Sequence, residues 1–368
     1  MSTNYNIILV GRSGYFKYGY KSGAGILRYA YSLYTNLKKI STFGIKTVET
    51  PLPKPLVPGN GLLSDKIYLS NRELFTDGDI IHYTDPSVYL PKLNKKIVIS
   101  TIHDLIPILE PAVVNDIPKY GYLKYNFIRK PIHLLNKFSV EFNNLSMLSN
   151  LKNSTYLIAN STQTKEEVLA FGIKNKKIKV INLGLDRRFI KSVKSSKHNN
   201  FFGVGYIGGL VYRKNIDFAI KAIKEIKEDK IILNIYGNLT RYARMLQENY
   251  PDKRIKFLGF VPEEQIVKIY DSFNVFVFPS LYEGFGLPIL EAQARGLPVI
   301  IYKYGKIPKE VRKYCFEAES PDHMAQIIEN IKENGYNKKV MKKAMEYARG
   351  FTWEKTAKET LEMYKKVV

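Results

Sequence analysis

Short apolar runs alternate with longer amphipathic stretches along most of this chain. The runs "DIIHYT", "KKIVISTIHD" and "NVFVFPS" are typical of buried strands, whereas "ILRYAYSLYTNLKK" and "KNIDFAIKAIKEIK" place apolar residues at helical spacing. Strands that alternate with helices predict parallel sheets with helices on both faces. The sequence therefore predicts an α/β fold.

This alternation stops at "KSVKSSKHNN" (191–200), where apolar periodicity disappears. Because 368 residues exceed the comfortable size of one hydrophobic core, we place a domain linker there. The prediction is two Rossmann-like, doubly wound domains, 1–190 and 200–350, with a C-terminal helix at about 351–368 that packs back on the first. Two such domains predict a cleft between them, with ligands at the carboxyl ends of the strands.

Composition adds two observations. The single cysteine, Cys315, excludes an internal disulfide and favours a reducing compartment, so we expect a cytoplasmic protein. No run approaches the roughly 18 consecutive apolar residues of a transmembrane helix. The net charge of +23 is compatible with nucleic acid, an anionic membrane surface or anionic small molecules, and charge alone does not choose among them.

The stretch "FPSLYEGFGLPILEAQARGLPVI" (278–300) places two acids in apolar surroundings. Glu283 lies in a glycine-rich turn after a strand, and Glu291 lies in a helix whose first position suits Pro288. The helix dipole favours an anion at this turn. The backbone N–H groups free to donate there are those of Phe285, Gly286 and Leu287. Such a turn suits a phosphate while the two carboxylates accept hydrogen bonds from hydroxyls, as binding of a nucleotide sugar requires.

A simpler interpretation is that "EGFG" is a plain connector and that Glu291 pairs with Arg295 on the helix surface. The order of the other motifs favours the binding site. From the N-terminus these motifs are "SGAGILRY", "TIHDLIP", "LIANSTQTKEEV", "INLGLDRRF", "IGGLVYRKN" and "LGFVPEEQ". With Glu-x7-Glu, they closely resemble retaining glycosyltransferases of family 4 (glycosyl transferases group 1), mannosyltransferase-like members included. The resemblance covers most of the chain and implies the GT-B architecture, two Rossmann-like domains that face each other across a cleft.

By this resemblance, the residues that act in the reaction are Glu283, His103, Asp104, Arg213 and Lys214. Arg213 and Lys214 neutralise the leaving diphosphate. Because the helix dipole disfavours cations at a helix N-terminus, their position also requires a local anion. His103 contacts the transferred sugar and is oriented by Asp104. His103 follows the run "KKIVIST" and so emerges at the carboxyl end of a strand, although a structural histidine is the alternative.

The donor site implied by the resemblance contacts each part of the nucleotide sugar. Glu283 contacts the sugar, Glu291 the ribose hydroxyls, and 258–260 the base, while glycines let the main chain approach the diphosphate. Many relatives carry Gly-Arg where this chain has Gly208-Gly209, so the charge comes from Arg213-Lys214. The complete set is Gly23, Ala24, Gly25, Gly208, Gly209, Arg213, Lys214, Leu258, Gly259, Phe260, Glu283, Gly284, Phe285, Gly286, Leu287 and Glu291.

One acidic motif is better explained without a ligand. The stretch "TDGDIIHY" contains Asp77-Gly78-Asp79, which resembles the Asp-x-Asp metal ligands of GT-A glycosyltransferases. Those ligands follow a buried strand, whereas this motif precedes one, so a turn capped by acids is the better interpretation. We therefore expect no metal and no cofactor, with a nucleotide-diphosphate sugar as substrate.

The resemblance implies retaining transfer of a hexose, of the mannose or glucose type, from GDP- or UDP-hexose to a glycan, lipid-linked or other hydroxyl acceptor. The segment "PKYGYLKYNFIRKPIHLLNKF" (118–138) mixes four lysines and one arginine with apolar residues and has no acid, so an anionic membrane surface is a further expected partner. Its alternative is a helix with a solvated basic face. The competing functions are a GT-B-fold sugar-nucleotide epimerase or hydrolase and, ranked last, a DNA-modifying glycosyltransferase or nucleic-acid-binding protein.

Overall fold

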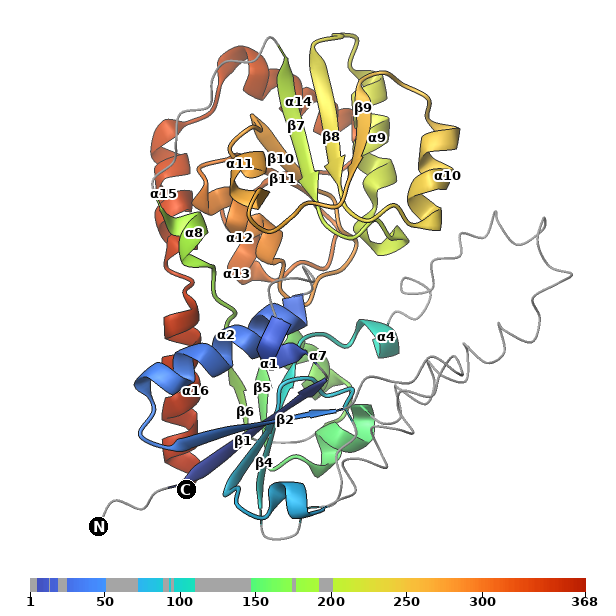
Figure 1. The fold of residues 1–368 in the computed structure, drawn as a ribbon. Helices are drawn as coiled ribbons and strands as arrows, with labels where there is room; N and C mark the ends of the chain where they lie inside the picture. Colours follow the sequence, from blue (N-terminus) through green and yellow to red (C-terminus); the bar gives the residue numbers. More distant parts are fainter. Residues whose placement is uncertain are drawn as a thin grey trace, which may run out of the picture. The chain divides into compact units, whose positions relative to one another are not determined.

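The computed structural model describes residues 5–12, 14–18, 25–50, 72–88, 93, 96–109, 147–173, 177–191 and 201–368. The chain forms two compact units (Figure 1). Among the described residues, the first unit comprises positions up to 184 together with 353–368, and the second comprises 185–352. Within these ranges no helix has the length and apolar character needed to cross a membrane. Outside the described residues lie Gly23, Ala24, the basic segment 118–138 and 192–200 of the expected linker.

The described strands of the first unit form a six-stranded parallel sheet in the order β2-β1-β3-β4-β5-β6. The strands are β1 (Asn6–Arg12), β2 (Gly44–Thr50), β3 (Ile80–Tyr83), β4 (Ile97–Ile102), β5 (Tyr156–Ala159) and β6 (Ile178–Val180). The helical segments are α1 (Tyr15–Tyr18), α2 (Gly25–Ile40), η1 (Arg72–Phe75), α4 (Ile106–Leu109), α7 (Thr162–Ala170) and α16 (Trp353–Val367). The strand order reverses between β1 and β3, and ligands bind at such a switch point in open α/β sheets.

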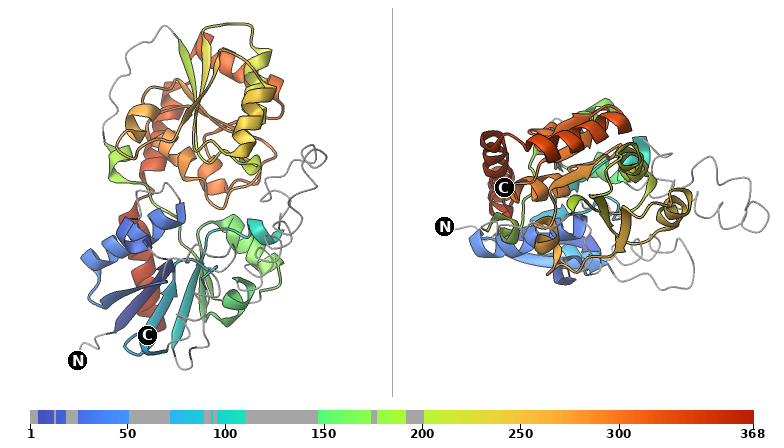
Figure 2. Two further views of the ribbon diagram at one scale, coloured as in Figure 1. Left: turned by 45° about the vertical axis from the view of Figure 1, so that its right-hand side comes forward. Right: turned by 90° about the horizontal axis from the view of Figure 1, so that it is seen from above.

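The described strands of the second unit form another six-stranded parallel sheet, in the order β12-β11-β10-β7-β8-β9 (Figure 2). The strands are β7 (Phe202–Ile207), β8 (Ile231–Tyr236), β9 (Ile255–Gly259), β10 (Val275–Phe278), β11 (Val299–Tyr302) and β12 (Phe316–Ala318). The helical segments are α8 (Arg187–Ile190), η2 (Tyr212–Lys214), α9 (Ile216–Glu225), α10 (Arg241–Asn249), α11 (Ile266–Tyr270), α12 (Leu287–Ala294), α13 (Lys309–Arg312), α14 (Pro321–Asn334) and α15 (Lys338–Arg349). This order reverses between β7 and β10 and is that of dinucleotide-binding folds. Two doubly wound sheets confirm the predicted α/β class.

Helices cover both faces of the second sheet. Right-handed crossovers place α9 and α10 on one face and α11, α12 and α13 on the other. Helix α14 lies beside α9, and α15 lies beside α12. Strand β10 is buried along its whole length. A strand covered from both sides reads as a continuous apolar run, which explains "VFVF".

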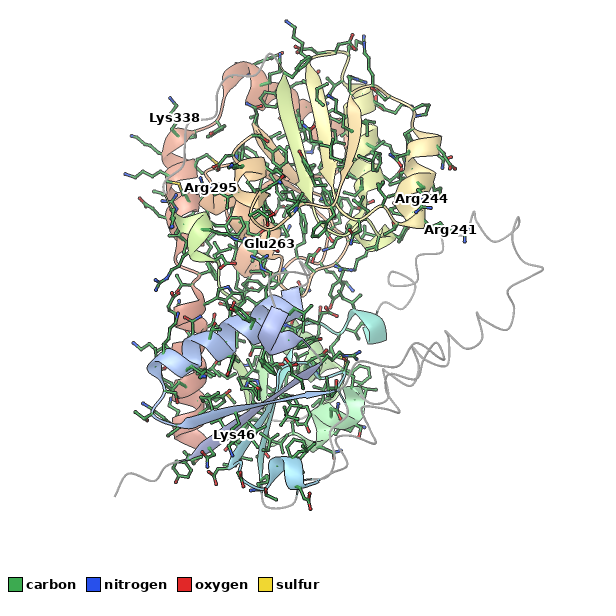
Figure 3. The ribbon with its side chains drawn as sticks, viewed as in Figure 1. Lys46, Arg241, Arg244, Glu263, Arg295 and Lys338 are labelled. Atoms are coloured by element: carbon green, nitrogen blue, oxygen red, sulfur yellow. The ribbon has the colours of Figure 1, made fainter. Side chains whose placement is uncertain are left out.

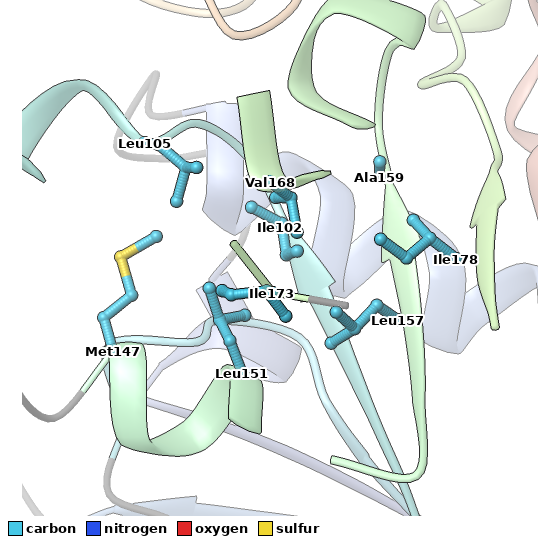
Figure 4. Close-up of a cluster of buried hydrophobic side chains, with 9 residues drawn as sticks. All are labelled: Ile102, Leu105, Met147, Leu151, Leu157, Ala159, Val168, Ile173 and Ile178. Atoms are coloured by element: carbon cyan, nitrogen blue, oxygen red, sulfur yellow. The ribbon is translucent and has the colours of Figure 1, made fainter. Parts of the chain in front are cut away.

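The first sheet also carries its core on both faces. On one face, α7 and the helical residues 147–153 pack against β4 and β5 around the cluster drawn in Figure 4. The members of this cluster are Ile102, Leu105, Met147, Leu151, Leu157, Ala159, Val168, Ile173 and Ile178. By the same crossover rule α2 lies on the opposite face, where α16 packs against it. Residues 353–368 therefore complete the first unit, although the chain reaches them through the second.

Candidate functional site

The loops after β7 and β10 are tied together at the switch point of the second sheet. The backbone N–H of Leu281, in the loop after β10, donates to the carbonyl of Arg213 in η2 at 2.9 Å. Asn215 takes a left-handed conformation, with φ of 53°, between η2 and α9. Its side-chain amide donates to the carbonyl of Pro279 at 3.2 Å. The basic pair is thereby held next to the motif that carries the acids.

Backbone geometry explains two glycines in and next to the stretch 278–300. Gly286 caps α12 with φ of 101°, a conformation that side-chain-bearing residues rarely adopt. Pro288 follows in the first turn, where its missing N–H costs no helical hydrogen bond. Gly305 approaches the carbonyl of Ser280 so closely that an added Cβ would lie 2.3 Å from it. The loop after β11 therefore packs directly on the motif.

A buried carboxylate is paired with two cations at this point. Lys214 donates from Nζ to Oε1 of Glu283 at 2.6 Å, and Nη1 of Arg213 lies 3.3 Å from Oε2. The hydroxyl of Ser280 donates to the same Oε1 at 2.6 Å. Glu283 is 6% exposed. The group has a net charge of +1, since two cations share one carboxylate.

The surroundings hold Glu283 in its ionised form. Burial alone would raise the pKa of this carboxyl. The charges of Lys214 and Arg213, together with hydrogen bonds from Lys214 and Ser280, lower the pKa by more than burial raises it, so it lies below its ordinary value. Burial and the charge of Glu283 raise the pKa of Tyr206 well above its ordinary value. The hydroxyl of Tyr206 stays protonated and donates to the carbonyl of Gly209 at 2.9 Å.

The structure thus brings together three residues that the sequence predicted for the reaction. The sequence required an anion beside Arg213 and Lys214, and the protein supplies it as Glu283. Ser280 was missed, although it stands at the end of the strand run "NVFVFPS", where polar residues of parallel sheets reach ligands. Tyr206 was missed as well, because a tyrosine inside a strand reads as core.

Glu291 is the most deeply buried acid of the motif, at 1% exposure. Its Oε2 accepts a hydrogen bond from the hydroxyl of Tyr270, in α11, at 2.8 Å. Arg295, labelled in Figure 3, donates to both carboxylate oxygens of Asp271 at 2.7 Å and to backbone carbonyls of α8 and Lys191. Glu291 is therefore not on a helix surface, and the simpler interpretation of an exposed i,i+4 pair is wrong.

Large apolar side chains are exposed at the carboxyl edge of the second sheet. They are Tyr212 after β7, Leu239 after β8, Leu258 and Phe260 at the end of β9, and Tyr304 after β11. Gly259, between two of them, has φ of 77° and open space around it. In open α/β sheets, ligands bind at this carboxyl edge. The predicted base contacts at 258–260 belong to this edge.

The remaining predicted donor residues divide into open and buried positions. Gly209 has open space where a side chain would stand, whereas a Cβ at Gly208 would lie 2.8 Å from the hydroxyl of Tyr206. Phe285 is buried and packs edge-on against Phe351 at 6.1 Å. Gly284 and Leu287 are buried beside it, and Gly25 is exposed at the first residue of α2.

His103 lies at the carboxyl edge of the first sheet, directly after β4. Its Nε2 is 2.8 Å from the carbonyl of Thr84, so Nε2 carries the proton. Burial lowers the pKa of His103, although the Thr84 carbonyl and the charges of Asp85 and Asp104 oppose the shift. The ring is neutral near pH 7. Asp104 accepts the backbone N–H of Ile106 at 3.1 Å and caps α4. The carbonyl of Thr84 therefore fixes Nε2, and the orienting role expected of Asp104 stays a prediction.

Asp85, directly after β3, is a third buried acid, and it was not among the predicted site residues. The hydroxyls of Ser87 and Tyr15 donate to it at 2.6 and 2.8 Å, and Nε of Arg12 lies 3.4 Å away. Burial raises the pKa of Asp85, but Arg12 and these donors outweigh burial and lower it. A signal was present: Asp85 follows the run "DIIHYT" as His103 follows "KKIVIST". Acid and imidazole therefore meet at one sheet edge.

The Asp-x-Asp motif lies at the opposite, amino edge of the first sheet. Asp77 pairs with Lys46 (labelled in Figure 3) at 2.7 Å, and Asp79 accepts the backbone N–H of Asn6 at 2.8 Å. Both acids precede β3, as the interpretation of a capped turn requires. Throughout the described ranges, no group of three or more histidine, cysteine, aspartate or glutamate side chains is arranged to hold a metal ion.

The sequence of the second unit decides its family. Residues 187–351 match the sequence model of Glycosyl transferases group 1. The second unit carries a glycosyl transferases group 1 domain. This domain includes η2, the loop after β10 and helix α12, and therefore the whole Lys214–Glu283 arrangement.

Known glycosyltransferases share sequence with longer parts of the chain. The chain is 27% identical over 301 residues to an uncharacterized glycosyltransferase, MJ1607, of Methanocaldococcus jannaschii, covering 78% of this chain and 75% of that one. It is 29% identical over 170 residues to O-antigen chain mannosyltransferase B of Escherichia coli, covering 44% of this chain and 45% of the relative. The chain is thus a homologue of glycosyltransferases, with less than half of the E. coli relative matched.

Solved structures resemble the whole chain at lower identity. A sucrose-phosphate synthase from Thermosynechococcus elongatus has a TM-score of 0.74 at 20% identity over 99% of both chains. Anabaena HepE, in complex with UDP and glucose, has a TM-score of 0.65 at 16% identity over 98% of this chain and all of that one. These likenesses confirm the predicted GT-B fold class.

Proposed function

We propose that this chain is a retaining glycosyltransferase that moves a hexose from a nucleotide-diphosphate sugar to a hydroxyl group of a glycan or lipid-linked acceptor. The observation that carries the proposal is the ion-paired group of Lys214, Arg213 and Glu283 at the switch point of the second sheet. The family of the second unit and the homologous glycosyltransferases support it.

The ion-paired group suits the charges that develop when a sugar–phosphate bond breaks. Negative charge grows on the departing diphosphate, and positive charge grows on the sugar ring. Lys214 and Arg213 are already oriented, so they stabilise the diphosphate without reorganising at the moment of reaction. Glu283, whose pKa is held low, stays anionic beside them and accepts hydrogen bonds from the sugar. Both kinds of charge are thus met by fixed groups.

The donor nucleotide would occupy the rest of the same edge. Glu291 would accept hydrogen bonds from the ribose, held in place by Tyr270. The exposed Leu258 and Phe260 would contact the base. The solved complex of HepE with UDP and glucose supports a nucleotide-sugar donor and, among donors, favours a uridine nucleotide. The mannosyltransferase relative favours mannose as the transferred sugar. The donor screen described below identifies both the sugar and the base.

His103 would contribute from the first unit as a neutral hydrogen-bond acceptor toward the transferred sugar. Its proton on Nε2 is engaged by Thr84, which leaves Nδ1 as an acceptor. Retention would follow from attack on the same face as departure, with the leaving phosphate taking the proton of the acceptor hydroxyl. No protein nucleophile and no metal is needed for this route.

We further propose that the protein acts at an anionic membrane surface, since segment 118–138 combines basic and apolar residues. Co-sedimentation with liposomes that contain anionic lipid, and none with neutral liposomes, is the expected result at low salt. Background sedimentation with both lipid compositions would contradict the membrane proposal and leave the transferase proposal standing.

The experiment that tests the transferase proposal has two stages. A thermal-shift screen with UDP-, GDP- and ADP-sugars identifies the donor, because a ligand of the folded state raises its melting temperature. Turnover with that donor then releases the nucleoside diphosphate only when an acceptor hydroxyl is supplied, and the proton NMR coupling at the new anomeric centre reports retention. Release at the same rate without any acceptor would instead indicate a hydrolase, and interconversion of the donor sugar would indicate an epimerase.

A further inference from the structure

A line of buried polar groups crosses the first unit from its C-terminal helix to α2. The hydroxyl of Tyr364, in α16, lies 2.5 Å from Nδ1 of His82 in β3. Nε2 of His82 lies 2.7 Å from the hydroxyl of Thr101 in β4, and that hydroxyl lies 2.8 Å from the hydroxyl of Tyr29 in α2. None of the four side chains is more than 1% exposed. We call these four residues the buried chain.

Strand geometry explains why these residues meet. Side chains alternate between the two faces of a sheet, so Thr101 and His103 share one face of β4 while Ile102 lies on the other. Ile102 belongs to the apolar cluster with α7. The face of Thr101 and His103 is therefore the one covered by α2 and α16, which supply Tyr29 and Tyr364.

In two proton arrangements the hydrogen bonds of the buried chain all run in one direction. Burial lowers the pKa of His82 to about 3, so its ring is neutral and carries one N–H. Thr101 also has a single proton to donate. If Nε2 of His82 donates to Thr101, then Thr101 donates to Tyr29 and Tyr364 donates to Nδ1. In the reverse arrangement Tyr29 donates to Thr101, Thr101 donates to Nε2 of His82, and Nδ1 of His82 donates to Tyr364. The tautomer of His82 and the direction of the Tyr29 hydroxyl are thus linked.

The end of the buried chain reaches the candidate site. The ring of Tyr29 packs edge-on against the ring of His103, with centroids 5.0 Å apart. Trp353, the single tryptophan of the protein and the first residue of α16, lies 6.3 Å from the same tyrosine ring. Helix α16 therefore acts on Tyr29 in two ways. Tyr364 is linked to it by the hydrogen bonds of the buried chain, and Trp353 contacts its ring.

We propose that Tyr364 is a positioning residue for His103, acting through His82, Thr101 and Tyr29. The C-terminal helix, which the chain adds only after completing the second unit, thereby sets the orientation of the imidazole at the carboxyl edge of the first sheet. The consequence for catalysis rests on the proposed role of His103 in sugar transfer, whereas the coupling itself does not.

The test uses two substitutions that each remove one hydroxyl and keep the shape of the side chain. Tyr364→Phe breaks the buried chain at its start, and Thr101→Val breaks it in the middle. Thr101→Ser keeps the hydroxyl and serves as the conservative variant. Thr360→Val removes another buried hydroxyl of α16, one turn away, which donates to the carbonyl of Thr356 and lies outside the buried chain.

The first readout is the nitrogen NMR signals of the histidine rings in the full-length protein. Tyr364→Phe and Thr101→Val are expected to shift the His103 signals and its titration in the same direction. The double variant should shift them no further than one substitution does, because groups that act in one network are not additive. Thr360→Val and Thr101→Ser should leave the His103 signals in place. Trp353 fluorescence checks that α16 stays docked in every variant.

The second readout is turnover with the donor found in the screen. We expect Tyr364→Phe to lower kcat about 3- to 10-fold with the donor Kd unchanged, since a misoriented group affects the reaction more than donor binding. Unchanged His103 signals in Tyr364→Phe, or additive shifts in the double variant, would overturn the positioning proposal. A wild-type protein that binds no nucleotide sugar would contradict the proposed function instead, and the NMR signals would still decide the coupling.

Discussion

The two parallel sheets carry different chemistry at equivalent edges. At the switch point of the second sheet, two cations share one buried carboxylate, so the group is positive. At the carboxyl edge of the first sheet, Asp85 is neutralised by Arg12 and His103 is neutral. The same architecture therefore presents a charged edge in one unit and a nearly neutral, hydrogen-bonding edge in the other.

The difference in charge between the two edges matches the different parts of the substrates that each edge would bind. Charge on a leaving diphosphate is stabilised by fixed cations, whereas sugar and acceptor hydroxyls need donors and acceptors rather than net charge. Each unit also protects its acid from protonation, because both Glu283 and Asp85 have lowered pKa values despite burial. The comparison predicts that substitutions at the charged edge affect catalysis most strongly.

The largest effect is expected from Lys214→Ala. Removing a fixed group that stabilises transition-state charge costs about 10²- to 10³-fold in kcat. The measurement is donor turnover under saturating conditions. The matched control is Lys221→Ala, since Lys221 also pairs with an acid at 2.7 Å but is half exposed on α9. Equal losses in the two variants would show that the charged edge has no special part in the reaction.

Glu283→Gln tests the same edge through stability. The amide keeps the shape but removes the charge that offsets Lys214 and Arg213, so the free energy of unfolding should fall by about 1.5–3 kcal/mol. Because the folded pKa of Glu283 lies below the ordinary 4.5, its ionised form stabilises the fold above that pH, and the contribution is lost as pH falls through the lowered value. On acidification below about pH 5, the melting temperature of the wild type should therefore decrease more than that of the variant.

A matched variant separates burial from pairing. Glu319 pairs with Lys303 at 2.5 Å on the surface, and this partner lowers its pKa too. Glu319→Gln should change the melting temperature little, because solvent screens exposed pairs. The other carboxylates, Asp85 included, are present in wild type and in both variants, so the differences between the acid profiles are assigned to the substituted residue. Parallel acid profiles for wild type and Glu283→Gln would mean that the buried pair contributes no pH-dependent stability.

The sequence predicted the charged edge better than the neutral one, for a physical reason. Arg213, Lys214 and Glu283 are charged residues in glycine-rich turns after apolar strands, so their types and positions both stand out. Their direct pairing was not predictable, since it depends on the hydrogen bond that joins Leu281 to Arg213 across the switch point. The alternation of apolar runs likewise predicted two parallel sheets, but periodicity contains no information about strand order.

The first unit shows what sequence patterns miss. His82 and Thr101 lie inside strand runs and read as core, and their partners Tyr29 and Tyr364 come from helices far away in the chain. The buried chain exists only because α16 returns to the first unit. His103 shows the same: the resemblance implies that Asp104 orients the ring, but no sequence pattern indicated that the carbonyl of Thr84, directly after β3, fixes Nε2.

Substitution of His103 should lower turnover by a smaller factor, and the effect should depend on pH. Because burial lowers its pKa below the ordinary 6.5, the neutral ring predominates near neutral pH and is protonated as pH falls through the lowered value. Turnover should therefore not depend on His103 ionisation at and above neutral pH, and should decline as the ring is protonated in acid. His103→Ala should lower kcat about 10-fold, the equivalent of one hydrogen bond, and remove that acidic limb. A rate that rises as the ring protonates would reverse the assignment of a neutral imidazole.

The smallest expected effect is on donor affinity, and it compares an exposed aromatic residue at each end of the second sheet. Phe260 and Phe201 are similarly exposed, at 52% and 56%, but Phe260 follows the carboxyl end of β9 whereas Phe201 precedes the amino end of β7. If ligands bind at the carboxyl edge, Phe260→Ala should weaken donor binding by about 0.5–1.5 kcal/mol, the range of one aromatic contact. Phe201→Ala should leave it unchanged. Calorimetric titration of both variants measures the difference directly, and equal donor affinities would place the base away from the end of β9.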